Sequence, residues 1–420
     1  MKGKSGITIP TGTPELQSRA LTSLCVLHPT YLFEQYGTAA YLTSFFKSNV
    51  YKESHPSKWK EQSREIISNM TLVVSIEARQ VDHAPSIQTP LIDVSNVLST
   101  KDQLPCRVLF KMELEQPSGS FKLRGIGHLV QQSIASARAK GHTRLHVIAS
   151  SGGNAGIAAA YSARFYDVPC TVVVPLKTMP HVVNRLHDLG ANVIIHGSSI
   201  NEASQHAKDL MHTFENDVHS IYCHPFDNSL IWDGHSAIVD EIMQQLTPEE
   251  TKKLRGVACS VGGGGLYNGI IQGLRKHRST ASCLLVETKQ APTLSQAVRE
   301  GAVVNLKSVD SIATSLACSY VPEETLRNFM HCETNTSFIR AIDDLETVKA
   351  SLKFYNDFGK PIEPACGAAV SVVYNQLDYL DMCLNDLKKD DIVVVVVCGG
   401  SCANEETLQK FKRMVRECHL

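Results

Sequence analysis

Four short segments of the 420-residue chain combine a turn-forming stretch with a reactive or hydrogen-bonding side chain. They are 117–125 (PSGSFKLRG), 150–156 (SSGGNAG), 262–266 (GGGGL) and 398–401 (CGGS). Lys122 stands on a Ser/Gly turn, where burial in a cleft would lower the pKa of its amine and make it a Schiff-base nucleophile. A lysine on such a turn is more often a solvated charge, so this segment by itself decides nothing.

The second and third segments each follow an apolar strand pattern and open a helix. Ser150, Ser151 and Gly152 offer hydroxyl and backbone N–H groups that suit a carboxylate, although Asn154 is equally a plain helix N-cap. The glycines at 262–265 let the backbone approach a ligand closely, and the helix N-terminus after them favours a phosphate. No Lys-Ser/Thr pair follows them, which disfavours a Walker-type nucleotide loop.

The order of the four segments along the chain indicates the kind of ligand better than any single segment does. Cys398 ends the last Val-rich strand pattern, where it is either an inert buried thiol or a neutral group that faces a ligand. A lysine on a turn, a carboxylate nest, a phosphate cradle and this final group would together hold an aldehyde cofactor with a phosphate and a ring nitrogen. Pyridoxal 5′-phosphate fits that description.

The apolar pattern between the segments predicts an α/β fold. Strands are expected at 144–149, 170–174, 192–196, 256–261, 283–287 and 391–397, and helices at 154–166, 180–189, 201–214 and from 266 onward. Such alternation is typical of parallel sheets, whose sites lie at the carboxyl ends of the strands. We expect two parallel-sheet, three-layer (αβα) domains with the cofactor in the cleft between them.

Composition excludes several classes of protein. The 41 Lys and Arg balance 42 Asp and Glu, so no strong field favours a nucleic acid or an anionic membrane. The longest apolar run, 392–398, is far shorter than the about 20 residues that a bilayer helix needs. The 13 cysteines show no zinc-type spacing. A secretory h-region is absent from the first residues, which favours a cytoplasmic protein and leaves a mitochondrial transit peptide open.

Together the motifs resemble the pyridoxal-phosphate-dependent family with the tryptophan-synthase-β type of fold. The resemblance is strongest to its eukaryotic catabolic L-serine dehydratase/L-threonine deaminase type. The matching stretches cover about 330 residues from roughly Ile87 onward: QPSGSFKLRGIGHL (116–129), SSGGNAGIAAAYSAR (150–164), LIWDGHSAIVDEI (230–242), SVGGGGLYNGIIQGL (260–274), EPACGAA (363–369) and VVVCGGS (395–401).

The resemblance implies a division of the chain into domains. A large cofactor-binding domain would comprise 87–123 and 226–420, and a small substrate-side domain would comprise 124–225. Residues 1–86 have no counterpart and show neither a clean period nor a chemical motif. They are expected to form an N-terminal extension, and a helical arm, a partner-binding segment and a poorly ordered stretch all stay open.

The resemblance also implies a role for each motif residue. Lys122 would join the cofactor aldehyde and act as acid and base, and Phe121 would pack on the pyridine ring. Asn154 would bond the ring 3′-hydroxyl, and Cys398 would face the pyridine nitrogen. The phosphate would lie on Gly262, Gly263, Gly264, Gly265 and Leu266. The substrate carboxylate would bind Ser150, Ser151 and Gly152. A monovalent cation, K⁺, would be held by Glu287, Ala291, Leu316 and Cys318.

The implied activity is that of a lyase of amino-acid catabolism. It would convert L-serine to pyruvate and ammonia and L-threonine to 2-oxobutyrate and ammonia, as a cytoplasmic homodimer that serves gluconeogenesis. A serine racemase or a biosynthetic threonine deaminase is the alternative within the fold, although these commonly carry serine at the position of Cys398. A non-catalytic binding or regulatory protein is the alternative of another class, and the intact Lys122 and Asn154 weigh against it.

Overall fold

The computed structural model describes residues 83–215, 217–331, 334–400 and 403–418. These belong to the second of two compact units of the chain, Arg79–Leu420, and the description concerns this unit alone. The expected extension at 1–86 lies outside the described residues up to position 82, and so does Ser401 of the last motif.

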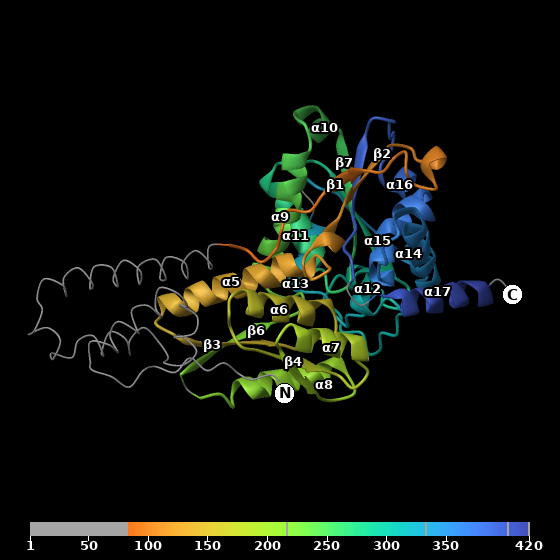
Figure 1. Ribbon diagram of the computed structural model, residues 1–420. Helices are drawn as coiled ribbons and strands as arrows, with labels where there is room; N and C mark the ends of the chain where they lie inside the picture. The colour runs from red at the N-terminus through yellow and green to blue at the C-terminus, as the bar shows by residue number, and fades with distance from the viewer. Residues whose placement is uncertain (1–82, 216, 332–333, 401–402, 419–420) are drawn as a thin grey trace, which may run out of the picture. The chain divides into compact units, whose positions relative to one another are not determined.

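Two sheets form the framework of the unit (Figure 1). The larger has the order β1-β2-β10-β7-β8-β9 and the smaller the order β5-β4-β3-β6. The strands are β1 Leu91–Asp93, β2 Arg107–Lys111, β3 Arg144–Ala149, β4 Cys170–Val174, β5 Asn192–Ile195, β6 Val218–Cys223, β7 Leu254–Ser260, β8 Ser282–Thr288, β9 Ser337–Ile342 and β10 Ile392–Val396. All neighbouring strands are parallel except the edge pair β1–β2. The predicted α/β fold is confirmed, with one antiparallel edge strand that the apolar pattern does not indicate.

Helices follow most of the strands. They are α5 Lys122–Ala139, α6 Asn154–Phe165, α7 Pro180–Asp188, α8 Ile200–Met211, α9 Ser229–Gln245, α10 Pro248–Lys253, α11 Gly265–Lys276, α12 Thr293–Glu300, α13 Glu323–Met330, α14 Asp344–Phe358, α15 Pro364–Tyr374, α16 Asp378–Cys383 and α17 Glu405–Glu417. Short 3-10 turns occur at η1 Lys101–Gln103, η2 Glu113–Glu115 and η3 Thr314–Leu316. Among the described helices, none has the length and apolar character that a bilayer-spanning segment requires.

The small lobe, residues 144–223, is layered because its strands are apolar on both faces. Val147 and Val172 belong to the core under α6, whereas Ile148 and Val173 belong to a separate cluster with Ala203 of α8. Since successive residues of a strand point to opposite faces, such runs need a helix on each side. The large lobe, which holds the six-stranded sheet, follows the same rule: the strand β10 is buried throughout. Figure 1 shows α9 and α11 on one face of that sheet and α14 and α15 on the other.

Helix α5 connects the two lobes. The chain passes from β2 of the large lobe through α5 into the small lobe and returns through α9. Along its length α5 packs on α6 and β6 of the small lobe and on α9 of the large lobe. The first residue of this helix is Lys122, so whatever fixes the start of α5 also fixes that amine.

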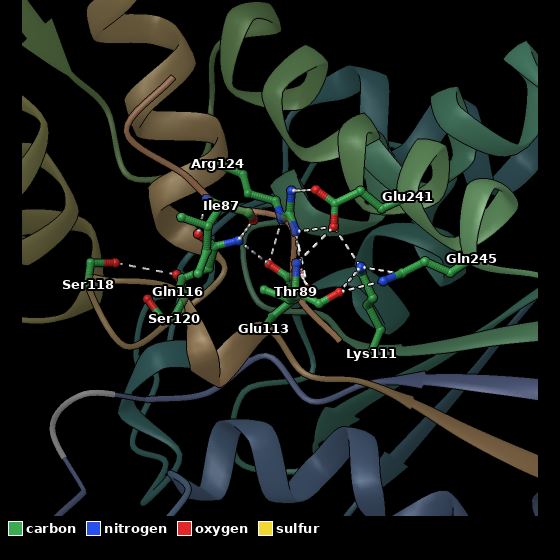
Figure 2. Close-up of polar contacts among 10 residues, drawn as sticks. All are labelled: Ile87, Thr89, Lys111, Glu113, Gln116, Ser118, Ser120, Arg124, Glu241 and Gln245. Carbon is green, nitrogen blue, oxygen red and sulfur yellow. Dashed lines mark hydrogen bonds and ion pairs between the residues drawn. The ribbon is translucent and has the colours of Figure 1, made fainter. Parts of the chain in front are cut away.

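A buried ionic network, formed by Lys111, Glu113, Arg124 and Glu241, holds the start of α5 against the large lobe (Figure 2). Arg124 donates to Glu113 at 2.6 and 2.8 Å and to Glu241 at 2.7 Å. Lys111 donates to Glu241 at 2.6 Å, and the Thr89 hydroxyl donates to Glu113 at 2.6 Å. Two cations therefore face two carboxylates, and this mutual pairing offsets the cost of removing four charges from water.

Breaking this network should destabilise the protein far more than breaking an exposed ion pair. In Glu113→Gln, Arg124 keeps its buried charge but loses a carboxylate, and the free energy of unfolding should fall by about 3 kcal/mol or more. Urea titration at pH 7 measures the loss. The control is Asp217→Asn, which removes an exposed partner of Arg144 and should cost much less. Equal losses in the two variants would contradict the assignment.

Candidate functional site

A cavity between the lobes collects loops that are far apart in the sequence. Its wall contains every residue that the sequence analysis assigned to the cofactor, together with two of the four cation candidates. These are Phe121, Lys122, Asn154, Gly262, Gly263, Gly264, Gly265, Leu266, Leu316, Cys318 and Cys398. The wall is completed by Phe226, Ser260, Ser315, Glu363, Ala365 and Gly399. Asn154 comes from the small lobe, and most of the others follow strands of the large lobe, so the predicted cleft between two sheets exists.

The amine of Lys122 is buried in this cavity. Its Nζ donates to the carbonyl oxygen of Pro225 at 2.6 Å and lies 5.1 Å from the centre of the Phe121 ring. Burial lowers the pKa of Lys122, because an ammonium loses its hydration there. Below the Phe121 ring lies the buried His235, with ring centres 4.9 Å apart, and burial lowers the pKa of that histidine well below its usual range. The lysine is thus a candidate nucleophile rather than a solvated charge.

The turn that carries Lys122 is fastened to the end of β10. Phe121 N–H donates to the carbonyl of Cys398 at 3.1 Å, and Gly400 N–H donates to the carbonyl of Gly119 at 3.1 Å. At Gly399, whose φ is +93°, a Cβ atom would lie 2.5 Å from that Gly119 carbonyl oxygen. Glycine is needed there, and the tight pairing holds the lysine and the Cys398 thiol in one wall of the cavity.

His224 precedes Pro225, whose carbonyl accepts the hydrogen bond from Lys122. The neutral ring of His224 holds the backbone of this turn. Its Nδ1 accepts the N–H of Asp227 at 2.8 Å, and burial lowers the pKa of the ring to about 4. The Tyr320 hydroxyl donates to the Asp227 carboxylate at 3.0 Å. This closed turn presents the Pro225 carbonyl toward Lys122.

The four glycines form a close-fitting loop before α11. Gly264 is the N-cap of α11 with φ +79°, and a Cβ atom there would lie 2.4 Å from Thr325. A Cβ atom at Gly263 would lie 2.3 Å from the Phe226 ring, and one at Gly262 2.8 Å from the backbone of Leu316. Backbone N–H groups in the first turn of a helix have no partner within the helix, so this loop suits a phosphate dianion.

Asn154, the first residue of α6, faces a carboxylate across the cavity. Its Nδ2 donates to both oxygens of Glu363, at 3.0 and 3.1 Å, and the Ser315 hydroxyl donates to the same carboxylate at 2.7 Å. Asn154 does not cap the helix that it begins, because Gly153 holds the N-cap position. The side chain is therefore directed to the cavity instead of to backbone N–H groups.

The thiol of Cys398, in the same wall as Lys122, lies among other small polar groups. The Ser260 hydroxyl is 3.7 Å from its sulfur, and the buried Cys366 accepts the N–H of Gly399 at 3.4 Å. Burial and the neighbouring Cys398 raise the pKa of Cys366 well above its usual range, so that thiol stays neutral.

The carboxylate-nest residues do not line the cavity wall itself. The Ser150 hydroxyl shares a hydrogen bond of 2.8 Å with the hydroxyl of Tyr222. Gly152 packs so closely on Thr178 that a Cβ atom would lie 2.2 Å from its Oγ1. Ser151 comes equally close to Gly156, where a Cβ atom would lie 2.0 Å from the Ser151 carbonyl oxygen. The loop follows β3 and precedes Asn154, at the carboxyl end of the small sheet.

Three of the candidate cation residues, Glu287, Ala291 and Cys318, lie near the start of α12, and the carbonyl of the fourth, Leu316, accepts the N–H of Cys318 at 2.7 Å. Glu287, fully buried at the end of β8, accepts the N–H groups of Leu294 and Ser295, and burial raises the pKa of its carboxyl to about 7. The Cys318 carbonyl accepts the hydroxyl of Thr293 at 2.6 Å, and Ala291 closes a turn on Thr288. Within the described ranges, no group of three or more His, Cys, Asp and Glu side chains is arranged to hold a metal ion.

Sequence reasoning missed several members of the wall. Glu363 stands in the EPACGAA motif, so a motif signal existed but indicated no contact. Ser260 likewise opens the quoted stretch 260–274, but no role was assigned to it. Ser315 and Phe226 stand in none of the quoted stretches, because each reaches the cavity only through the way the sheets pack.

The residues present fit pyridoxal phosphate, and comparisons with known proteins agree. The family described as "Pyridoxal-phosphate dependent enzyme" matches residues 85–399. An L-serine dehydratase of Saccharomyces cerevisiae is 39% identical over 306 residues, which is 71% of this chain and 90% of the yeast protein. An L-serine dehydratase/L-threonine deaminase of Mus musculus is 38% identical over 335 residues, 78% of this chain and 94% of the mouse protein.

A solved structure agrees with these two relatives. The crystal structure of a fungal L-serine ammonia-lyase from Rhizomucor miehei superposes with a TM-score of 0.70 at 30% identity. The alignment covers 79% of this chain and 99% of the fungal protein.

Adding one methyl group to the glycine loop should weaken cofactor binding. Gly264→Ala introduces strain at a positive φ and a collision with Thr325, so the affinity of the apoprotein for pyridoxal 5′-phosphate should fall by about tenfold or more, equivalent to 1.4 kcal/mol. Absorbance titration gives the dissociation constant. The matched control is Gly301→Ala, which has φ +64° but no heavy atom within 4 Å of a new Cβ. An equal loss of affinity in the control would assign the effect to general strain.

Proposed function

The chain belongs to the pyridoxal-phosphate dependent enzymes, and from this premise we propose that it is an L-serine/L-threonine dehydratase. It removes water from L-serine to yield pyruvate and ammonia, and acts likewise on L-threonine to yield 2-oxobutyrate and ammonia. Support comes from the identity to the yeast and mouse enzymes over nine-tenths or more of their length.

The observation that carries the proposal is the convergence of Lys122, the glycine loop and Cys398 on one cavity. A buried amine, a phosphate-type loop and a buried thiol suit the aldehyde, the phosphoryl group and the ring nitrogen of the cofactor, respectively. When bound, the cofactor supplies an electron sink for the bonding electrons at the substrate α-carbon. Proton transfer, binding and orientation of the substrate are carried out by residues of this protein.

Lys122 performs the proton transfers. Its lowered pKa favours a neutral amine, which is the form that attacks an aldehyde and that accepts a proton. As a free amine, Lys122 Nζ would be the base that accepts the proton from the substrate α-carbon. The Pro225 carbonyl at 2.6 Å holds Nζ in place.

The other assigned residues bind and orient. Phe121 packs on the cofactor ring, Asn154 bonds the ring 3′-oxygen, and the glycines with Leu266 hold the phosphate. Ser150, Ser151 and Gly152 hold the substrate carboxylate. The Cys398 thiol would face the ring nitrogen without the charge of an aspartate. The sink is therefore weaker, which favours rapid loss of the β-hydroxyl over racemisation.

We propose K⁺ as a second cofactor, held by Glu287 with Ala291, Leu316 and Cys318. The support is the buried Glu287 carboxylate just before α12 and the backbone of Leu316, which lies against Gly262 of the glycine loop. Oxygen donors of this kind are what a hard cation prefers.

The finer organisation of the enzyme also stays a proposal. The large domain would comprise 87–123 and 226–420, and the small domain 124–225, a division that the two sheets support. The resemblance of the motifs supports a cytoplasmic homodimer that acts in amino-acid catabolism and serves gluconeogenesis.

Purified protein with pyridoxal phosphate should release 2-oxo acids from L-serine and L-threonine. Coupling pyruvate to lactate dehydrogenase measures the rate, and chiral chromatography measures D-serine. Lys122→Ala should lower kcat by about a thousandfold or more, because it removes both nucleophile and base. A variant that keeps wild-type turnover, or accumulation of D-serine with little pyruvate, would overturn the proposal.

Exchange of K⁺ for tetramethylammonium should lower the rate severalfold, since the larger ion cannot fit among protein oxygens. The wild-type enzyme should recover when K⁺ is restored. Glu287→Gln should be slower and nearly insensitive to the exchange, whereas the exposed Glu249→Gln should behave as wild type. Identical rates in both salts for the wild-type enzyme would remove the cation from the proposal.

A further inference from the structure

Glu363 is a buried carboxylate in the cavity wall that the proposed reaction does not use. Its residue is 7% exposed, and its oxygens accept from Asn154 Nδ2 and from the Ser315 hydroxyl. The three partners come from the starts of α15 and α6 and from η3, separated in sequence by 209 and 48 positions. Burying a carboxylate costs free energy unless hydrogen bonds replace its water. The hydrogen bonds from Asn154 and Ser315 do so here, which points to a specific role for Glu363.

The Glu363 side chain does not cap α15, the helix at whose N-terminus this residue stands. Glu363 is the N-cap of α15 and precedes Pro364, yet its side chain makes no capping hydrogen bond. N-cap side chains usually accept a backbone N–H of their own helix. Here the carboxylate extends to the cavity instead. Gly400 makes room for it, because a Cβ atom there would lie 2.3 Å from Glu363 Cγ.

A carboxylate can decide how a neighbouring amide is oriented. An asparagine amide has a donating end and an accepting end that exchange when the group turns by half a revolution. An ionised carboxylate only accepts, so the Nδ2 end of Asn154 must face Glu363. Nδ2 carries two hydrogens: one is directed to the Glu363 carboxylate, and the second, which contacts the Ser315 oxygen only at the long distance of 3.4 Å, makes the amide a hydrogen-bond donor toward the cavity.

We infer that Glu363 is a positioning residue, whose carboxylate holds the Asn154 amide as a donor toward the 3′-oxygen of the cofactor ring. The inference rests on the proposed function. The 3′-oxygen of the Lys122-bound cofactor carries negative charge in its visible-absorbing form, and a donor stabilises that form. If the amide turned, its carbonyl would face this oxygen and repel it.

The decisive substitution is Glu363→Gln. It keeps the shape of the side chain but removes the group that only accepts hydrogen bonds and so fixes the orientation of the Asn154 amide. A glutamine amide can donate or accept, so both orientations of Asn154 become possible. We expect the ratio of the visible to the near-ultraviolet cofactor band to fall at least threefold. We also expect affinity for pyridoxal phosphate to fall about tenfold, equivalent to 1.4 kcal/mol. Thermal unfolding of the apoprotein should change little, and Glu249→Gln serves as the matched control on the surface.

A double-mutant cycle separates this role from general support of the cavity. If Glu363 acts through the amide, Asn154→Ala shows the same spectral change, and Glu363→Gln adds nothing in its background. A wild-type band ratio in Glu363→Gln, or spectral effects that simply add in the double variant, overturns the inference. A wild-type protein that binds no pyridoxal phosphate would instead refute the proposed function, so the two failures are distinguishable.

Discussion

Arg124 makes the interaction on which the geometry of the site depends most. Its guanidinium lies between the carboxylates of Glu113 and Glu241, almost out of contact with water, two residues after Lys122. Four charges with so little access to solvent tolerate little displacement, since any shift leaves one of them unpaired. The same network binds the backbone of Thr89, so the first described segment, β2, α5 and α9 meet at one rigid point. The helix that carries the lysine is thereby fixed to the large lobe before it enters the small one.

The rest of the cavity follows from parallel sheets. Strands that run in the same direction bring the loops after β3, β6, β7, β8 and β10 to their carboxyl ends, where the polar groups of those loops meet. The turn that carries Lys122 lies at the same edge of the sheet, because its backbone is hydrogen-bonded to the residues that follow β10. Catalytic, phosphate-binding and ring-binding groups therefore come from segments hundreds of positions apart, while each is held by a short local turn.

The electrostatics of Lys122 and of the buried groups around the cavity are set mainly by burial. Loss of hydration lowers the pKa of Lys122, His224 and His235 and raises that of Glu287. All four shifts favour the neutral form of the group. The Glu363 carboxylate accepts hydrogen bonds from Asn154 and Ser315 in place of water. The buried surroundings of Lys122 suit chemistry that depends on a neutral lysine.

The sequence by itself determined the features that arise from neighbouring residues. Apolar runs located β3 and β4 at their observed bounds, and the motifs located Lys122, Asn154, the glycine loop and Cys398, because turn chemistry and strand or helix periods involve residues only a few positions apart. Only the tertiary structure decided the partners: Pro225 for Lys122, 103 positions away, and Glu363 for Asn154, 209 positions away. It also revealed β1 and the pairing of Arg124 with Glu241. Spacing along the chain carries no record of which distant groups meet, since that depends on how whole sheets and helices pack.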